Sequence, residues 1–94
     1  MAVNSNSVAD EIASTVAELK QVEEDLRQRR ENIIKYHADF EEISQLPPWE
    51  VKDRLLELKL EQIQGTKTRI AQLEYSKRSL EEIERLLRIK LRDL

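Results

Sequence analysis

The 94-residue chain contains no cysteine, one histidine and one glycine. The lack of cysteine excludes a disulfide framework and thiolate chemistry, and it fits an intracellular location, cytoplasmic or nuclear. A catalytic metal needs several clustered ligands, and His37 supplies only one. The single glycine, Gly65, is too little for the glycine-rich loops that cradle phosphate groups. We therefore expect no metal, no cofactor and no enzymatic activity.

Long apolar runs are absent as well. No stretch of about 18 apolar residues is present to span a bilayer, and the first residues lack the basic and apolar regions of a secretory signal. We therefore expect no direct membrane insertion. Charged residues of both signs make up 37% of the chain and leave a formal net charge of -3. A negative net charge argues against general nucleic-acid binding, which relies on a strong positive field.

Proline is scarce too, because the chain has only Pro47 and Pro48, which are adjacent. So few turn-forming residues are typical of an all-α fold. On each side of the prolines, apolar residues recur with a period of seven, the spacing that places one apolar stripe along a helix. The stripe before the prolines contains Ile12, Leu19, Val22, Leu26, Ile33, Tyr36, Phe40 and Ile43. The stripe after them contains Leu56, Ile63, Ile70, Leu73, Leu80, Leu87 and Leu94.

The two prolines predict a break between two helices. Pro47 lacks an amide proton and disfavours helical geometry at Leu46, so the first helix should end there. Pro48 suits the first turn of a second helix, with Glu50 near the positive end of its dipole. Because the break is short, we predict an antiparallel two-helix coiled-coil hairpin, completed into a larger helical bundle by self-association or partner helices. A kinked single helix is the alternative.

The same signals predict the boundaries of each segment. Ser7 should cap the first helix, with Asp10 in its first turn. The predicted segments are a flexible lead at residues 1–7 and one helical-hairpin domain at 8–94, which consists of helix 8–45, turn 46–48 and helix 48–94.

A closed hairpin also predicts which residues face each other. Residues whose numbers add up to about 96 should be opposite one another, which pairs Tyr36 with Leu60 and Ile12 with Ile83 or Glu84. Midway along, two arginines, Arg29 and Arg30, come level with the helix-weakening Gly65. We expect this stretch to be the weak joint of the hairpin.

More apolar residues are present than one stripe per helix can bury. Exposed apolar rows usually mark interaction sites, so we expect the protein to act as a non-catalytic scaffold or adaptor that binds other helical proteins or a second copy of itself. Trp49 either fills the end of the hairpin against Leu46 and Phe40 or anchors a partner. The candidate partner-binding residues are Val51, Leu55, Leu58, Tyr75, Leu86, Ile89 and Trp49.

A basic stretch near the C-terminus allows a second hypothesis. Its cations are Arg85, Arg88, Lys90 and Arg92. They are the candidate residues for a nucleic-acid-associated helical protein, in which they would contact phosphates. Cations in a last helical turn also complement the helix dipole, which explains them without any ligand.

Two general resemblances are present. The length and the hairpin plan are similar to the small secreted helical hairpins of the WXG100 class, whose Trp-x-Gly turn is Trp49-Glu50-Val51 here. Membership would imply a secreted helical hairpin. The acidic hairpin with a Leu46-Pro47-Pro48 turn is also similar to coiled-coil subunits of kinetochore, Mediator or vesicle-tethering complexes. That resemblance implies an adaptor subunit of a multiprotein assembly.

Overall fold

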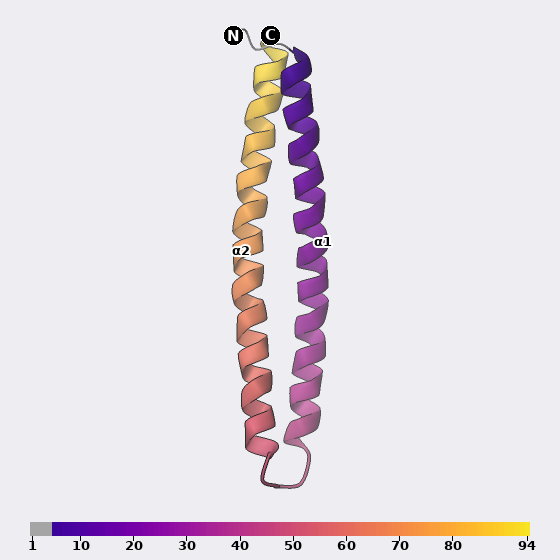
Figure 1. Ribbon diagram of the computed structural model, residues 1–94, viewed down its shortest axis with the longest axis vertical. Coiled ribbons are helices and arrows are strands. Elements are labelled where there is room, and N and C mark those ends of the chain that lie inside the picture. The colour runs from indigo at the N-terminus through magenta and orange to yellow at the C-terminus, as the bar shows by residue number, and fades with distance from the viewer. Residues whose placement is uncertain (1–4) are drawn as a thin grey trace. The chain divides into compact units, whose positions relative to one another are not determined.

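The computed structural model describes residues 5–94 of the protein. These residues form two α-helices, α1 (Ser5–Ser44) and α2 (Lys52–Arg92), joined by a connection at residues 45–51 (Figure 1). The helices pack against each other as a hairpin, and the described residues contain no strand. The predicted all-α helical hairpin is therefore confirmed, whereas its completion into a larger bundle stays a prediction.

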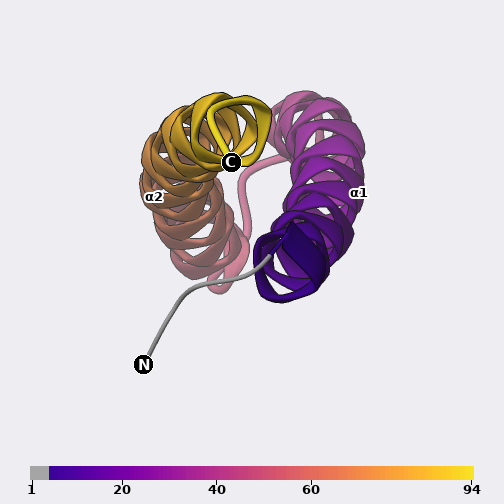
Figure 2. The ribbon, with the colours of Figure 1, turned by 90° about the horizontal axis from the view of Figure 1, so that it is seen from above.

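The chain divides into two compact units, and each helix contributes to both. Unit 1 comprises Met1–Asp25 and Leu73–Leu94, so that the beginning of α1 lies beside the end of α2 (Figure 2). Unit 2 comprises Leu26–Gln72 and contains the end of α1, the connection and the beginning of α2. In both units the core is the seam between the two helices.

The buried face of α1 follows alternating steps of four and three residues. Its buried residues are Val8, Ile12, Thr15, Leu19 and Leu26, and its half-buried ones include Val22, Ile33, Tyr36, Phe40 and Ile43. This is the predicted stripe, extended towards the N-terminus by Val8, which is 1% exposed. Such spacing keeps one side of the helix turned towards its partner.

The buried face of α2 follows the same steps. Ile63, Thr66 and Leu73 are buried, and Ile70 and Leu80 are half-buried. The last predicted member of the stripe, Leu94, lies beyond the end of the helix and is exposed, so its assignment to the seam is wrong.

Two threonines occupy buried seam positions, one on each helix. The hydroxyl of Thr15 donates to the carbonyl oxygen of Glu11 at 2.9 Å. The hydroxyl of Thr66 donates to the carbonyl oxygen of Gln62, also at 2.9 Å. Each hydroxyl is therefore satisfied within its own helix, and burial leaves no unmade hydrogen bond.

The first helix starts earlier than the sequence signals indicated. Of the predicted flexible lead, residues 1–4 lie outside the described residues, and residues 5–7 are helical. Ser7 therefore lies inside the first turn of α1 and is not its cap. The physical reason is that Val8 already belongs to the seam, so the helix must be formed on its N-terminal side.

The second helix begins at Lys52, four residues after the predicted start at Pro48. Leu46 and Pro47 each precede a proline, a position that disfavours helical geometry. The amide of Lys52 donates to the carbonyl oxygen of Trp49 at 3.2 Å, which closes the first turn. Asp53 is the acidic residue in that turn, and Glu50 lies two residues before the helix begins.

The ammonium group of Lys52 also stabilises the end of α1. Its Nζ atom donates to the carbonyl oxygens of Ser44 at 3.0 Å and Leu46 at 2.6 Å. The last carbonyls of a helix have no partner within the helix and sit at the negative end of its dipole. A cation from the start of α2 therefore replaces the basic residue that the last turn of α1 lacks.

Contacts between the helices support the predicted register, except that Lys59 takes the place predicted for Leu60. Lys59 lies 3.2 Å from the carboxylate of Asp39, and Lys77 lies 3.9 Å from that of Glu23. The numbers in these pairs add up to roughly 98 to 100, close to the expected value of about 96.

Tyr36, however, does not pair with Leu60, which is 53% exposed. The ammonium of Lys59 lies 5.2 Å from the centroid of the Tyr36 ring. The lysine can take this place because its methylene stem is apolar and its charge is matched by the ring face and Asp39. At the other end of the hairpin, Ile83 is exposed and Glu84 is half-buried, so Glu84 occupies the seam position.

Gly65 lies on an exposed side of α2, where a methyl group would meet no atom within 4 Å. We predict that Gly65→Ala raises the free energy of unfolding by about 1 kcal/mol, because alanine restricts the unfolded chain and favours the helix. Urea unfolding measures the change. The matched control, Ala71→Gly at another exposed position of α2, should lower the value by a similar amount. A loss of stability in Gly65→Ala would contradict the exposed placement.

Leu26 is 2% exposed, the deepest seam position in unit 2. We predict that Leu26→Ala lowers the free energy of unfolding by about 2–4 kcal/mol, because it leaves a cavity between the helices. Leu60→Ala, which removes the same atoms at an exposed site, should cost less than about 1 kcal/mol. Equal losses in the two variants, measured by urea unfolding, would contradict the register described above.

Candidate interaction surfaces

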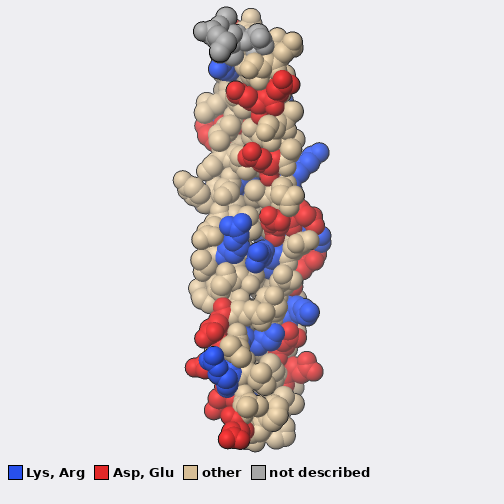
Figure 3. Space-filling view, viewed as in Figure 1, with Lys and Arg blue, Asp and Glu red and all other residues tan. Residues whose placement is uncertain are grey.

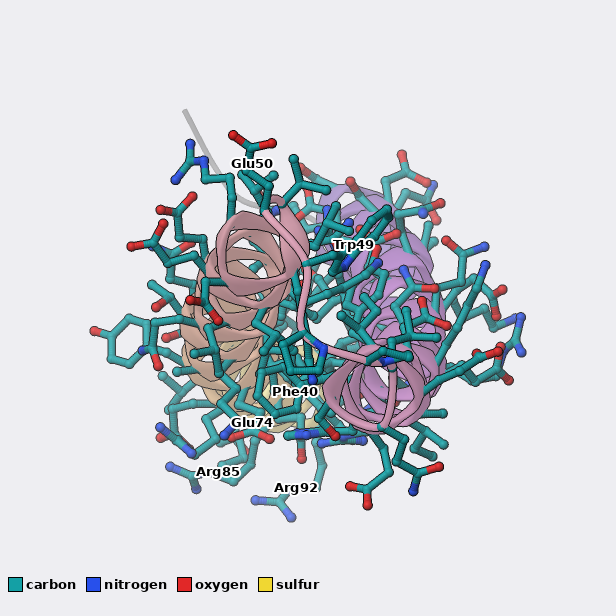
Figure 4. The ribbon with its side chains drawn as sticks, turned by 90° about the horizontal axis from the view of Figure 1, so that it is seen from below. Phe40, Trp49, Glu50, Glu74, Arg85 and Arg92 are labelled. Atoms are coloured by element: carbon teal, nitrogen blue, oxygen red, sulfur yellow. The ribbon has the colours of Figure 1, made fainter. Side chains whose placement is uncertain are left out.

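The connection between the helices exposes a group of apolar side chains, which we call the apolar tip: Leu46, Pro47, Trp49 and Val51. Leu46, Pro47 and Trp49 line a shallow hollow of about 250 Å³. Figure 4 shows Phe40 between the helices and Trp49 in the connection. Because Trp49 is 54% exposed, it fills the end of the hairpin only in part, and half of its surface is left available to a partner.

The predicted partner-binding residues fall into both units. In unit 2, Val51 and Leu58 are exposed and Leu55 is half-buried, one turn from each of them. In unit 1, Leu86 is 52% exposed and Ile89, one turn further on, is half-buried.

Tyr75 is also exposed, but it precedes Leu86 by about three turns of α2. The residues of unit 1 therefore do not form one continuous patch. The structure brings together Leu86 with Ile89, and Val51 with Leu55 and Leu58.

Sequence reasoning missed two exposed apolar residues because it assigned them to the seam. In each case the neighbouring residue in the sequence, which is charged, occupies the seam position instead: Lys59 next to Leu60, and Glu84 next to Ile83. The exposure of Leu60 could have been predicted from the regular alternation of steps of four and three residues, which includes Lys59 and Ile63 but not Leu60. Hydrophobicity alone favours Leu60 over Lys59 as the seam residue.

Acidic residues surround the apolar tip. Residues 39–57 contain six acidic and two basic residues. The two basic ones are engaged locally, since Lys52 binds backbone carbonyls and Arg54 lies 2.9 Å from Glu57. Glu41 and Glu42 are exposed in the last turn of α1, where a negative charge is unfavourable to the helix dipole. Glu41 and Glu42 therefore do not serve local helix stability.

Basic residues gather further along unit 2, in a zone that we call the basic belt: residues 27–35 of α1 and 64–69 of α2. It contains six basic residues and one acidic residue. Ile34 lies in this zone and is 72% exposed. On the face shown in Figure 3, the charged side chains nearest to the connection are carboxylates, and Lys and Arg gather further along.

Three of the four basic residues near the C-terminus, Arg85, Arg88 and Arg92, lie near carboxylates of neighbouring residues in the sequence. Arg85 binds Glu82 through two nitrogen atoms, at 2.9 Å and 2.5 Å. Arg88 lies 3.7 Å from Glu84, and Arg92 lies 3.7 Å from Asp93. In Figure 4, Arg85 and Arg92 point outwards from the helix pair. The charges of Arg85, Arg88 and Arg92 are thus partly compensated, which disfavours phosphate binding by these three residues.

The chain matches no protein-family model, no curated protein and no solved structure. Within residues 5–94, neither helix is long and apolar enough to cross a membrane. In the same residues, no three His, Cys, Asp or Glu side chains are grouped so that they could hold a metal ion.

The hydrogen bonds from Arg85 lower the pKa of Glu82 below its ordinary value of 4.5. We predict that Arg85→Gln raises the pKa of Glu82, measured by the NMR shift of its carboxyl carbon. Because the folded-state pKa is lowered, the pair's contribution to stability is present above the ordinary value and is lost as the pH falls through the lowered one. Arg88→Gln should leave the Glu82 titration unchanged. Identical Glu82 midpoints in wild type and Arg85→Gln would refute the pairing.

Proposed function

We propose that this protein is a non-catalytic helical-hairpin module that binds other helical chains and acts as a scaffold or adaptor subunit of a multiprotein assembly. One observation carries the proposal: among the described residues, ten large apolar side chains are at least 42% exposed. They occur in both units, from Ile34 and Trp49 to Leu86. The neighbouring ones, such as Leu46, Trp49 and Val51 of the apolar tip, carry the most weight, because contiguous exposed apolar surface is uncommon on soluble monomers.

The physical driving force is the removal of apolar surface from water. Burial contributes about 25 cal/mol per Å², so several half-exposed leucine, isoleucine or tryptophan side chains supply the favourable term in association. The charged residues around them, such as Glu42 near the tip and Lys35 in the basic belt, select the partner and its orientation. Nothing in this mechanism requires a reacting group.

The proposal is tested with two variants of the exposed apolar residues. One variant carries Leu86→Asp and Ile89→Asp in unit 1, and the other carries Val51→Asp and Leu58→Asp in unit 2. We expect at least one of them to lower the molar mass measured by light scattering or to lose the proteins captured by affinity purification. The reason is that a charge in an apolar interface must be desolvated without a partner.

A matched control carries Ser14→Asp and Gln72→Asp, two exposed polar positions that receive the same charge without losing an apolar group. It should behave like the wild type in both measurements. Circular dichroism checks that each variant remains helical. If both apolar variants keep the wild-type mass and capture the same proteins, the proposed function is contradicted.

A further inference from the structure

We propose that unit 2 pairs with unit 2 of a second copy of this chain about a two-fold axis, so that the acidic, apolar tip of each copy covers the basic belt of the other. This inference rests on the proposed function and names the partner and the surface. A two-fold arrangement is closed, because each copy offers both surfaces and receives both. No further partner is needed to cover them.

Charge is the first argument for a second copy. The tip segment, residues 39–57, carries six acidic and two basic residues, and the basic belt carries six basic and one acidic residue. The two surfaces are therefore opposite in sign, and like-charged pairings, tip to tip or belt to belt, are penalised. Opposite surfaces on one protein favour a copy placed antiparallel to the first.

Apolar fit is the second argument. Ile34 is 72% exposed in the middle of the belt, flanked by Arg30 and Lys35. The hollow between Leu46 and Trp49, at about 250 Å³, has room for one aliphatic side chain. Ile34 lies ten residues before the end of α1, about 15 Å along the helix at 1.5 Å per residue, so it does not reach the hollow of its own chain. In an antiparallel pair, Ile34 of each copy enters the hollow of the other, so the same contact forms twice.

The placement of the acidic residues is the third argument. Glu41 and Glu42 stand in the last turn of α1, where a negative charge opposes the helix dipole. Association with cations of a second copy gives these carboxylates a favourable role. Arg30 and Lys35 lie on either side of Ile34 in the sequence and on opposite flanks of its helix face, where they can meet carboxylates on both sides of the tip.

Charge reversal tests this arrangement directly. The tip variant carries Glu42→Lys and Glu50→Lys, and the belt variant carries Arg30→Glu and Lys35→Glu. Each alone should raise the dimer dissociation constant, measured by sedimentation velocity, by about tenfold or more. An equimolar mixture of the two should restore the dimer as a heterodimer, because its tip and belt charges are again opposite at both contacts.

Three further variants keep the result specific. A control with Glu18→Lys and Glu61→Lys changes the net charge as the tip variant does, but at exposed positions outside both surfaces. This control should weaken the dimer less than the tip variant does. It should also fail to restore a dimer when it is mixed with the belt variant. Ile34→Ala should raise the dissociation constant by about tenfold. Glu42→Lys alone should weaken the dimer while raising the unfolding midpoint of the monomer, which separates association from folding.

The possible outcomes distinguish this inference from the proposed function. A monomeric wild type at all concentrations, or a mixture that fails to form the heterodimer, overturns the two-fold pairing. A wild-type dimer that is indifferent to charge reversal and to Ile34→Ala also overturns it, although the protein would still be an interaction module. Loss of dimer in each single reversal with rescue in the mixture supports the pairing.

Discussion

The narrow seam between two helices is the constraint on which the rest of this structure depends. Each helix turns one stripe towards the other, and among the described residues only six apolar side chains are buried: Val8, Ile12, Leu19, Leu26, Ile63 and Leu73. A small chain with so limited a core is modestly stabilised on its own. The same geometry leaves the outer faces of both helices in water, together with the apolar residues that they carry. Exposure of those residues is therefore a direct consequence of a two-helix design.

Charged side chains complete what the apolar stripe leaves open. The ammonium group of Lys59 lies over the Tyr36 ring and beside the carboxylate of Asp39. The ammonium group of Lys52 donates to the carbonyl oxygens of Ser44, at the end of α1, and of Leu46, in the connection. Both lysines link the two helices in unit 2 without being apolar. Further out, the segregation of acidic residues at the tip and basic residues in the belt gives this unit a polarity along its helices. A surface with such polarity discriminates between partners and between orientations of one partner.

The sequence was sufficient for features that depend on periodicity, and insufficient for those that depend on how neighbouring side chains compete. The hairpin and the stripe from Ile12 to Ile43 follow from spacing and from Pro47. The start of α2 at Lys52 does not, because it depends on the path of the chain after two consecutive prolines. The preference for Lys59 over Leu60 in the seam depends on partners across the helix pair. The hollow at Trp49 depends on the same connection, and the surfaces for partners stay predictions.

Every surface described above depends on α1 and α2 folding back on each other at the connection. The protein has no cysteine, so nitroxide labels can be attached specifically at Lys20→Cys and Arg78→Cys, two exposed positions of unit 1. Electron–electron double resonance, with the labelled chain diluted in unlabelled protein, then reports the distance within one chain. Adjacent helices with axes about 8–10 Å apart predict a label distance below about 35 Å. A distribution entirely beyond about 60 Å would contradict the hairpin, because a continuous helix would place these positions about 87 Å apart at 1.5 Å per residue.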